Sequence, residues 1–192
     1  MNWDQVAADG LSVIHEVTVE LRPEVERIAR LLATRLSAGG KILLCGNGGS
    51  AADAQHMAGE LVNRFLIDRR PYAALALSTD TSVLTAVAND GSFEDVFAKQ
   101  VLALGRPGDV LVAFSTSGNS PNVCRAVEAA QTLENVISVA VAGRPGSRLV
   151  QLSTESLCIR SASDTPRIQE AHLLILHTLC QRIEEILEHA DP

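Results

Sequence analysis

The chain has 192 residues, of which 46% are hydrophobic, 20% charged and 3% aromatic, and its formal net charge is −7. This length and composition are typical of one globular domain with a full core. The negative charge and the few aromatic side chains argue against a nucleic-acid-binding surface, because such surfaces are basic and often stack bases on aromatic rings.

The sequence also predicts the cellular setting. No apolar run approaches the roughly 20 residues that a membrane-spanning helix needs, so we expect no membrane association. The N-terminal stretch MNWDQVAADG is acidic and polar, unlike a signal peptide. The cysteines form no CxxC pair and are typical of buried thiols in a cytoplasmic protein; they are Cys45, Cys124, Cys158 and Cys180.

Two helices are predicted within residues 1–38. Pro23 is typical of the first turn of the second helix, and Gly39-Gly40 of its end. Apolar side chains recur at helical spacing at Val13, Ile14, Val17 and Leu21, and then at Val25, Ile28, Leu31, Leu32 and Leu36.

Five short apolar runs then alternate with helix-compatible sequence. Strands that alternate with helices indicate a parallel sheet covered on both faces. We therefore predict an α/β three-layer sandwich with a five-stranded parallel sheet. The runs are KILLCG (41–46), YAALAL (72–77), DVLVAF (109–114), VISVAV (136–141) and ESLCIR (155–160).

A long amphipathic helix is predicted over residues 165–188. No internal repeat or low-complexity segment divides the chain, so we expect one domain over residues 1–192, with N-terminal helices in 1–38, an α/β core in 41–160 and this C-terminal helix. The apolar side of the helix carries Ile168, Leu173, Leu176, Leu179, Cys180, Ile183 and Leu187.

The loop GNGGS (46–50) follows the first predicted strand. In open α/β sheets, ligands bind beyond the carboxyl ends of the strands. The loop matches neither the GxxxxGK[ST] nor the GxGxxG nucleotide motif, and no acidic residue ends the second strand, where a ribose would need one. A smaller phosphorylated ligand is therefore favoured, although such glycines also suit an ordinary tight turn.

A second polar loop, STSGNSPN (115–122), follows the third predicted strand. A helix is expected to begin near Pro121, and a helix N-terminus favours anions through its free N–H groups and dipole. The hydroxyls exceed what capping by Ser120 or Asn119 would need, so the loop predicts a site for a phosphate monoester. These hydroxyls belong to Ser115, Thr116, Ser117 and Ser120.

Four polar side chains on two predicted helices suggest further chemistry. His56 and Glu60 are four residues apart and share a helix face, where they could bind a divalent metal, provide a general base, or form a solvated hydrogen-bonded pair. Gln169 and His177 are about 80° and roughly 12 Å apart on a helix, so spacing alone does not pair them. His172 and His177 lie among leucines, where a histidine is usually a core residue, but two such histidines together with a glutamine argue against that interpretation.

Several collinear stretches together resemble the phosphoheptose isomerases of the sugar isomerase (SIS) fold, over about residues 25–188. The resemblance implies a flavodoxin-like aldose–ketose isomerase that interconverts sedoheptulose 7-phosphate and D-glycero-D-manno-heptose 7-phosphate through an enediol. It implies a role in nucleotide-activated heptose biosynthesis, for the lipopolysaccharide core or another surface glycan, and a homotetramer with active sites between subunits. The stretches are GNGGSAADAQHMAGE, LSTDTSVLTAVAND, GDVLVAFSTSGNSPNV and RIQEAHLLILH.

The resemblance also assigns expected roles. Glu60 and His177 would transfer protons, and the sequence leaves open whether Glu60 is mainly a ligand or a base, because coordination lowers the basicity of a carboxylate. One metal ion per subunit, usually zinc, would be held by His56, Glu60, Gln169 and His177. The substrate contacts would be Asn47, Gly48, Gly49, Glu60, Asn89, Asp90, Ser115, Thr116, Ser117, Ser120 and Gln169.

Some features depart from the family or leave alternatives open. Asn89-Asp90 before a glycine is also typical of a simple turn. The loop AGRPGSRL (142–149) replaces a TGxxGG-like family loop, and the first twenty residues match poorly. One alternative is a non-enzymatic paralogue that binds the replication initiator, but such proteins lose the glutamate and histidine found here as Glu60 and His177. A sugar-phosphate sensor and an isomerase of another sugar phosphate are the others.

Overall fold

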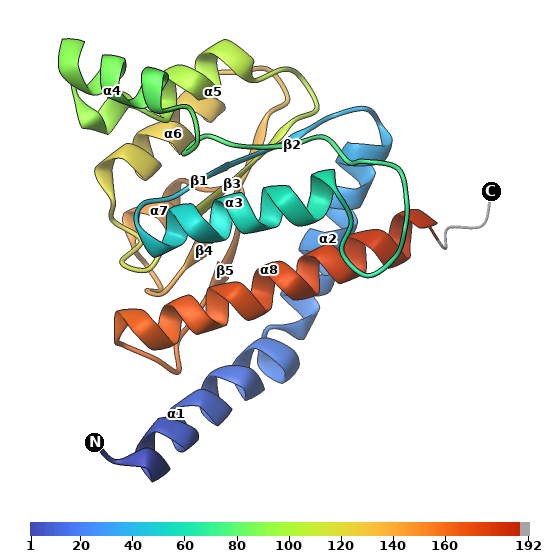
Figure 1. Cartoon of the computed structure of the whole chain (residues 1–192), viewed down its shortest axis with the longest axis vertical. Helices are drawn as coiled ribbons and strands as arrows, with labels where there is room; N and C mark the ends of the chain where they lie inside the picture. The colour runs from blue at the N-terminus through green and yellow to red at the C-terminus, as the bar shows by residue number, and fades with distance from the viewer. Residues whose placement is uncertain (189–192) are drawn as a thin grey trace.

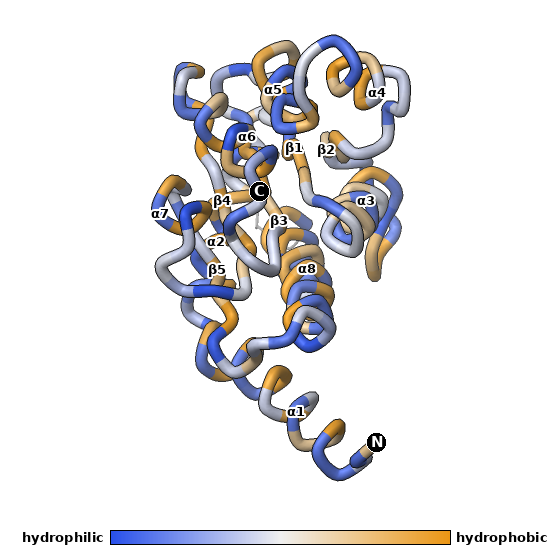
Figure 2. The backbone as a smooth tube through the Cα atoms, turned by 90° about the vertical axis from the view of Figure 1, so that its left-hand side faces the viewer, coloured by the Kyte–Doolittle hydropathy of each residue, from blue (hydrophilic) through white to orange (hydrophobic). Residues whose placement is uncertain are grey.

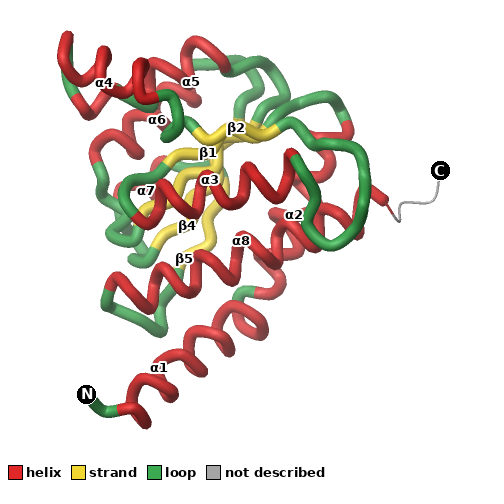
Figure 3. The backbone as a smooth tube through the Cα atoms, in the orientation of Figure 1, coloured by secondary structure: helices red, strands yellow, loops and turns green. Residues whose placement is uncertain are grey.

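A parallel five-stranded sheet forms the middle layer of the computed structural model, which describes residues 1–188 (Figure 1). The strand order is β2-β1-β3-β4-β5, and all four neighbouring pairs are parallel. This sheet confirms the predicted α/β class and places a helical layer on each side (Figure 3). The strands are β1 (Ile42–Cys45), β2 (Ala74–Ala76), β3 (Val110–Ser115), β4 (Ile137–Ala142) and β5 (Glu155–Cys158).

The helices divide between the two faces of the sheet. Helices α2, α3 and α8 share a core with Ile42 and Leu44 of β1, while α5, α6 and α7 share one with Leu43 and Cys45. The continuous apolar runs of the strands follow from this burial on both faces. The helices are α1 (Trp3–His15), α2 (Arg22–Ser37), α3 (Gly49–Val62), α4 (Thr81–Asp90), α5 (Ala98–Leu104), α6 (Pro121–Gln131), α7 (Arg148–Leu152) and α8 (Thr165–Glu188), with a π-helix at Glu16–Glu20 and a 3-10 helix at Phe93–Asp95.

The N-terminal region forms the two predicted helices, joined by the π-helix. Val13 and Val17 are buried, whereas Ile14, which shares their helical periodicity, is 50% exposed. Figure 2 shows α1 extending away from the sheet. The carboxylate of Glu16 accepts the N–H groups of Arg160 and Ser161 at 2.7 and 2.9 Å, which attaches this region to the loop before α8.

Helix α8 has the bounds that the sequence predicts. It packs against α2, α3 and α1, and most of its predicted apolar positions are buried, but Leu173 is 38% exposed. The four cysteines are free and buried, as predicted. Within residues 1–188, no helix has both the length and the apolar character needed to cross a membrane.

The strand order brings the two polar loops together. Strand β1 lies between β2 and β3, so the chain reverses its direction of travel across the sheet at β1. In sheets of the order 2-1-3-4-5, ligands bind at this switch point, beyond the carboxyl ends of β1 and β3. Residues 46–50 follow β1, and residues 115–122 begin at the last residue of β3.

Candidate functional site

The glycine loop turns the chain from β1 into α3. Gly48 has φ 56° and ψ −121°, a conformation that strongly favours glycine, and Gly49 is the first residue of α3. A Cβ atom at Gly49 would overlap the side-chain amide of Gln169 in α8. The structure therefore places two predicted ligand-binding residues, Gly49 and Gln169, directly against each other.

The serine loop gathers three of its predicted hydroxyls before α6. Ser115 Oγ lies 3.1 Å from Ser120 Oγ and 3.5 Å from Ser117 Oγ, and it accepts the Gly118 N–H at 3.1 Å. Ser120 is the N-cap residue of α6, but its side chain makes no capping bond within the described chain. The hydroxyls therefore converge with the helix N-terminus, a setting that suits an anion. Thr116 lies outside this group of hydrogen bonds among residues 1–188.

A pair of asparagines joins the two loops. Asn47 and Asn122 each donate a side-chain N–H to the other's Oδ1 atom, both at 2.8 Å. Asn122 is 3% exposed and lies in the first turn of α6. It was not predicted as a site residue, and its place inside STSGNSPN is the signal that could have identified it. The glycine and serine loops thus form one connected polar surface.

Three of the four predicted metal ligands meet between α3 and α8. His56 Nε2 lies 3.0 Å from Glu60 Oε1 and 3.3 Å from His177 Nε2, and the three ligand atoms lie within 4.8 Å of one another. Nitrogen and oxygen ligands bound about 2.0–2.1 Å from a tetrahedral ion lie about 3.3 Å apart. The donor atoms and their spacing therefore fit a divalent metal ion.

Gln169 lies at the opposite end of α3 from this cluster. Its amide contacts Gly49, and His56 follows Gly49 by seven residues, which is about 10 Å along the helix. Within a single chain, the structure thus brings together His56, Glu60 and His177 and places Gln169 at the glycine loop. The role of Gln169 as a metal ligand stays a prediction.

The surroundings of His177 favour its neutral form. Burial and the neighbouring His56 lower the pKa of His177, and the nearby Glu60 carboxylate only partly opposes them. The ring of Phe65 stacks on the imidazole, with the centroids 5.5 Å apart and the planes at 28°. A neutral imidazole can bind a metal or accept a proton. Phe65 was not predicted from the sequence, since it belongs to no motif.

Asp53 is a further acidic group on α3, three residues before His56. It is 9% exposed, and burial raises its pKa to about 6 although His56 opposes this. Its Oδ2 atom has no hydrogen-bond partner among the described residues. Asp53 was not predicted as a site residue, although its spacing to His56 places both on one side of the helix.

Asn89 and Asp90 are the last residues of α4. The turn expected there begins only at Gly91, because the helix continues through Asp90. Asn89 donates its side-chain N–H to Asp90 Oδ1 at 2.8 Å, and both side chains are exposed. Within residues 1–188, no hydrogen bond joins them to the other predicted site residues.

A cavity of about 570 Å³ lies elsewhere, between β2, α4 and α5. None of the predicted site residues lines this cavity, and its lining is mainly apolar. The glycine loop, the serine loop and the cluster of His56, Glu60 and His177 are therefore the better candidate for the functional site. It is lined by Leu75, Ala76, Thr79, Asp80, Val83, Lys99, Gln100, Ala103 and Leu104.

His172 is a core residue, which decides between the alternatives that the sequence leaves open for it. Its side chain is fully buried and packs against Phe114, with ring centroids 6.1 Å apart. The ring approaches the Ala142 carbonyl, but neither ring nitrogen reaches hydrogen-bonding geometry with any described residue. Burial lowers the pKa of His172 to about 4.

This buried histidine predicts a pH-dependent stability. Between the unfolded pKa of 6.5 and the folded value of about 4, the unfolded chain binds more protons, so the free energy of unfolding falls as the pH decreases through this range. The loss should reach roughly 2–3 kcal/mol at pH 4.5 relative to pH 7.5. Urea unfolding of His172→Leu and of the unmodified chain at both pH values measures the contribution of His172 to this loss. An identical pH dependence of the free energy of unfolding in both proteins would contradict the prediction.

Comparison with known proteins identifies relatives over most of the chain. The SIS domain profile matches residues 7–143. A phosphoheptose isomerase of Thiobacillus denitrificans is 54% identical over 169 residues, which cover 87% of this chain and 85% of the relative. The structure of a phosphoheptose isomerase from Neisseria gonorrhoeae is 42% identical, with a TM-score of 0.86, and the match covers 95% of this chain and 98% of that one. One from Francisella tularensis is 35% identical, with a TM-score of 0.89 and coverage of 96% and 100%.

Proposed function

Because the chain belongs to the phosphoheptose isomerase family of SIS-domain proteins, we propose that it converts sedoheptulose 7-phosphate to D-glycero-D-manno-heptose 7-phosphate. The observation that carries this proposal is the convergence of His56, Glu60 and His177 on adjoining helices. The non-enzymatic alternative expects Glu60 and His177 to be lost, whereas both are present in this cluster. The product would supply nucleotide-activated heptose for a surface glycan.

The serine loop would hold the phosphate end of the substrate. The hydroxyls of Ser115, Ser117 and Ser120 and the N-terminus of α6 offer hydrogen bonds to a dianion without a lysine. The glycine loop, with Asn47 oriented by Asn122, would contact the polar groups of the sugar. Anchoring the open-chain sugar at one end would align its reacting carbons at the other.

The proton transfers would be carried out by two side chains. Glu60 takes the proton from C1 of the ketose, which gives the enediol, and returns it to C2 of the developing aldose. His177 moves a proton from the O1 hydroxyl to the O2 oxygen, so that the protons balance. The lowered pKa of His177 supports this role, because a neutral imidazole is ready to accept a proton.

A zinc ion would complete the site, at one per subunit. His56, Glu60 and His177 would hold it in this chain, with Gln169 as the fourth predicted ligand. When bound, zinc supplies a Lewis acid that polarises the carbonyl and hydroxyl oxygens of the sugar. The spacing of the three donor atoms supports this assignment.

The working form would be a cytoplasmic homotetramer with active sites between subunits. Gln169 is separated from the cluster of His56, Glu60 and His177 (the histidine cluster), which supports a site made of residues from two chains. Large exposed apolar side chains support subunit contacts through α1 and the β2 edge: Trp3 is 72% exposed, Leu11 66% and Leu75 40%. Exposed apolar surface of this kind is typical of protein interfaces.

A substrate panel tests the proposed specificity. The purified chain should turn over sedoheptulose 7-phosphate with a higher kcat/KM than fructose 6-phosphate. Unphosphorylated sedoheptulose should be worse by at least about a hundredfold, because it lacks several hydrogen bonds to a charged group. Faster turnover of the hexose phosphate would favour an isomerase of another sugar.

Ser120→Ala tests the phosphate anchor. Ser120 Oγ lies 3.1 Å from Ser115 Oγ beside the N-terminus of α6, and one hydrogen bond to a charged group contributes about 1.5–3 kcal/mol. We therefore expect KM to rise about ten- to hundredfold, and inhibition by inorganic phosphate to weaken to a similar degree. Ser37→Ala, at the exposed last residue of α2, is the control. An unchanged KM and phosphate inhibition in Ser120→Ala would move the phosphate site elsewhere.

A further inference from the structure

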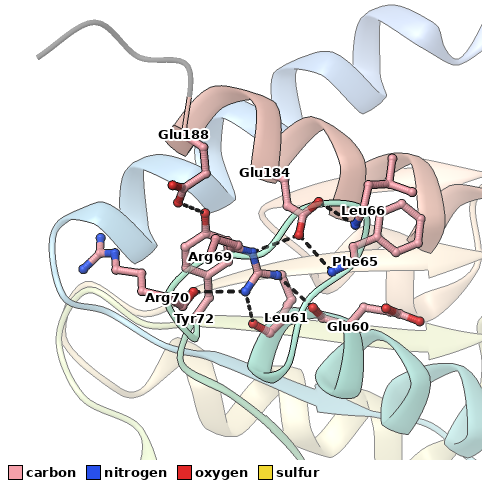
Figure 4. Close-up of polar contacts among 9 residues, drawn as sticks. All are labelled: Glu60, Leu61, Phe65, Leu66, Arg69, Arg70, Tyr72, Glu184 and Glu188. Carbon is pink, nitrogen blue, oxygen red and sulfur yellow. Dashed lines mark hydrogen bonds and ion pairs between the residues drawn. The ribbon is translucent and has the colours of Figure 1, made fainter.

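A buried ion pair joins Arg69 and Glu184, and Figure 4 shows their contacts with Glu60, Leu61, Phe65 and Leu66. Arg69 Nε donates to Glu184 Oε1 at 2.9 Å, and the side chains are 0% and 3% exposed. Arg69 belongs to the loop between α3 and β2, and Glu184 to the last turns of α8. A buried ion pair is well placed only when its remaining polar atoms are also hydrogen-bonded, so the other partners of these two residues are informative.

The partners of Glu184 lead to His177. The carboxylate accepts the backbone N–H groups of Phe65 and Leu66, both at 2.8 Å. This contact holds the backbone of Phe65, whose ring stacks on the imidazole of His177. Glu184 is therefore linked through Phe65 to His177, a proposed proton-transfer residue.

The partners of Arg69 lead to Glu60. Its guanidinium donates to the Glu60 carbonyl through Nη2 at 2.8 Å and to the Leu61 carbonyl through Nη1 at 2.9 Å. Both carbonyls lie in the last turn of α3, where carbonyl groups lack partners inside the helix. Arg69 thus fixes the backbone of the second proton-transfer residue.

We infer that Arg69 and Glu184 are positioning residues, which set Glu60 on α3 and His177 on α8 at the separation that metal binding and proton transfer require. The inference rests on the proposed function of those two residues. Neither Arg69 nor Glu184 is among the proposed substrate contacts or metal ligands. Each acts through a backbone or ring contact on a residue that is, in the manner of the outer partners that orient metal ligands.

The same loop and helix share a second contact that serves as a control. Tyr72 OH donates to Glu188 at 2.6 Å, which also attaches the loop to α8. Neither of these residues has a hydrogen bond or ring contact with Glu60, Phe65 or His177 among residues 1–188. The Tyr72 ring also packs on the Arg69 guanidinium, 3.9 Å from its central carbon, and the Tyr72 N–H donates to the Leu61 carbonyl. Phenylalanine keeps the ring and the N–H, so Tyr72→Phe removes only the hydroxyl contact with Glu188.

The experiment compares three variants: Glu184→Gln, Phe65→Leu and Tyr72→Phe. Phe65→Leu removes the ring that stacks on His177 but keeps the buried ion pair. If Glu184→Gln does not fold, Phe65→Leu still tests whether this contact positions His177. The measurements are kcat, KM for sedoheptulose 7-phosphate, the zinc Kd by chelator competition, and the unfolding temperature. We expect Glu184→Gln and Phe65→Leu to lower kcat and raise the zinc Kd by about ten- to hundredfold, with KM within about twofold.

Tyr72→Phe should lower only the unfolding temperature. The inference is overturned if the folded variants keep the kcat and zinc Kd of the unmodified chain, or differ from it no more than Tyr72→Phe does. A failure of the proposed function gives a different result, because the unmodified chain itself would then bind zinc without isomerising the sugar. In that case the zinc Kd of the variants still decides the positioning role, and an unmodified chain that binds no zinc overturns both.

Discussion

Glu60→Gln should lower kcat for sedoheptulose 7-phosphate by about 10²- to 10⁴-fold and leave binding of the sugar phosphate nearly unchanged. Glutamine has the size of glutamate and keeps a side-chain oxygen, but it cannot take a proton from carbon at neutral pH. The carboxylate replaced here lies 3.0 Å from His56 Nε2, inside the three-residue cluster. Steady-state kinetics and titration with the substrate measure the two effects separately.

The zinc Kd of Glu60→Gln separates the two roles that the sequence leaves open. A kcat that falls while the zinc Kd changes little identifies Glu60 as mainly a base, because the amide oxygen still serves as a ligand. A large loss of zinc affinity identifies it as mainly a ligand. Glu134→Gln, at an exposed position, is the control. An unchanged kcat in Glu60→Gln would remove this residue from the mechanism.

Removal of the metal should have the second large effect. Polarisation of the reacting oxygens is worth several kcal/mol, so a chelated enzyme should lose at least about a hundredfold in kcat. Activity should return when zinc is added, and circular dichroism should show that the apo protein keeps its fold. A chain that stays fully active while elemental analysis finds no bound metal would contradict the assignment of His56, Glu60 and His177 as ligands.

The layers and elements of the fold follow from local sequence signals. The apolar run at residues 41–46 contains β1, and the run at 109–114 contains all of β3 except its last residue, Ser115, because strands buried on both faces need continuous apolar sequence. The bounds of α8 were also predicted, since a long amphipathic period begins at Thr165-Pro166 and continues without a break to Glu188. Once the strand order is 2-1-3-4-5, the two polar loops must meet at the switch point.

Exposure of apolar side chains was predicted less well. Ile14 and Leu173 have helical periodicity but are 50% and 38% exposed. Periodicity identifies the apolar side of a helix, but it does not say whether the same chain covers that side. The proposed subunit contacts would cover such positions.

The site could be predicted only in part, because its residues are distant in sequence. His56 and Glu60 share a helix face by their spacing, whereas the approach of His177 depends on how α3 packs against α8. The resemblance to a family, and not the spacing, pointed to His177. Arg69 and Glu184 are separated by more than a hundred residues and belong to no motif, so only the folded chain reveals their contact.

The most direct test of the proposed function is a time course of the purified zinc-loaded chain with sedoheptulose 7-phosphate, followed by NMR of the anomeric protons. We predict that signals of D-glycero-D-manno-heptose 7-phosphate appear at the expense of the ketose until equilibrium, at a rate that Glu60→Gln nearly abolishes. A ketose spectrum that stays unchanged in the presence of folded, zinc-loaded protein would contradict the assignment of this chain as the isomerase.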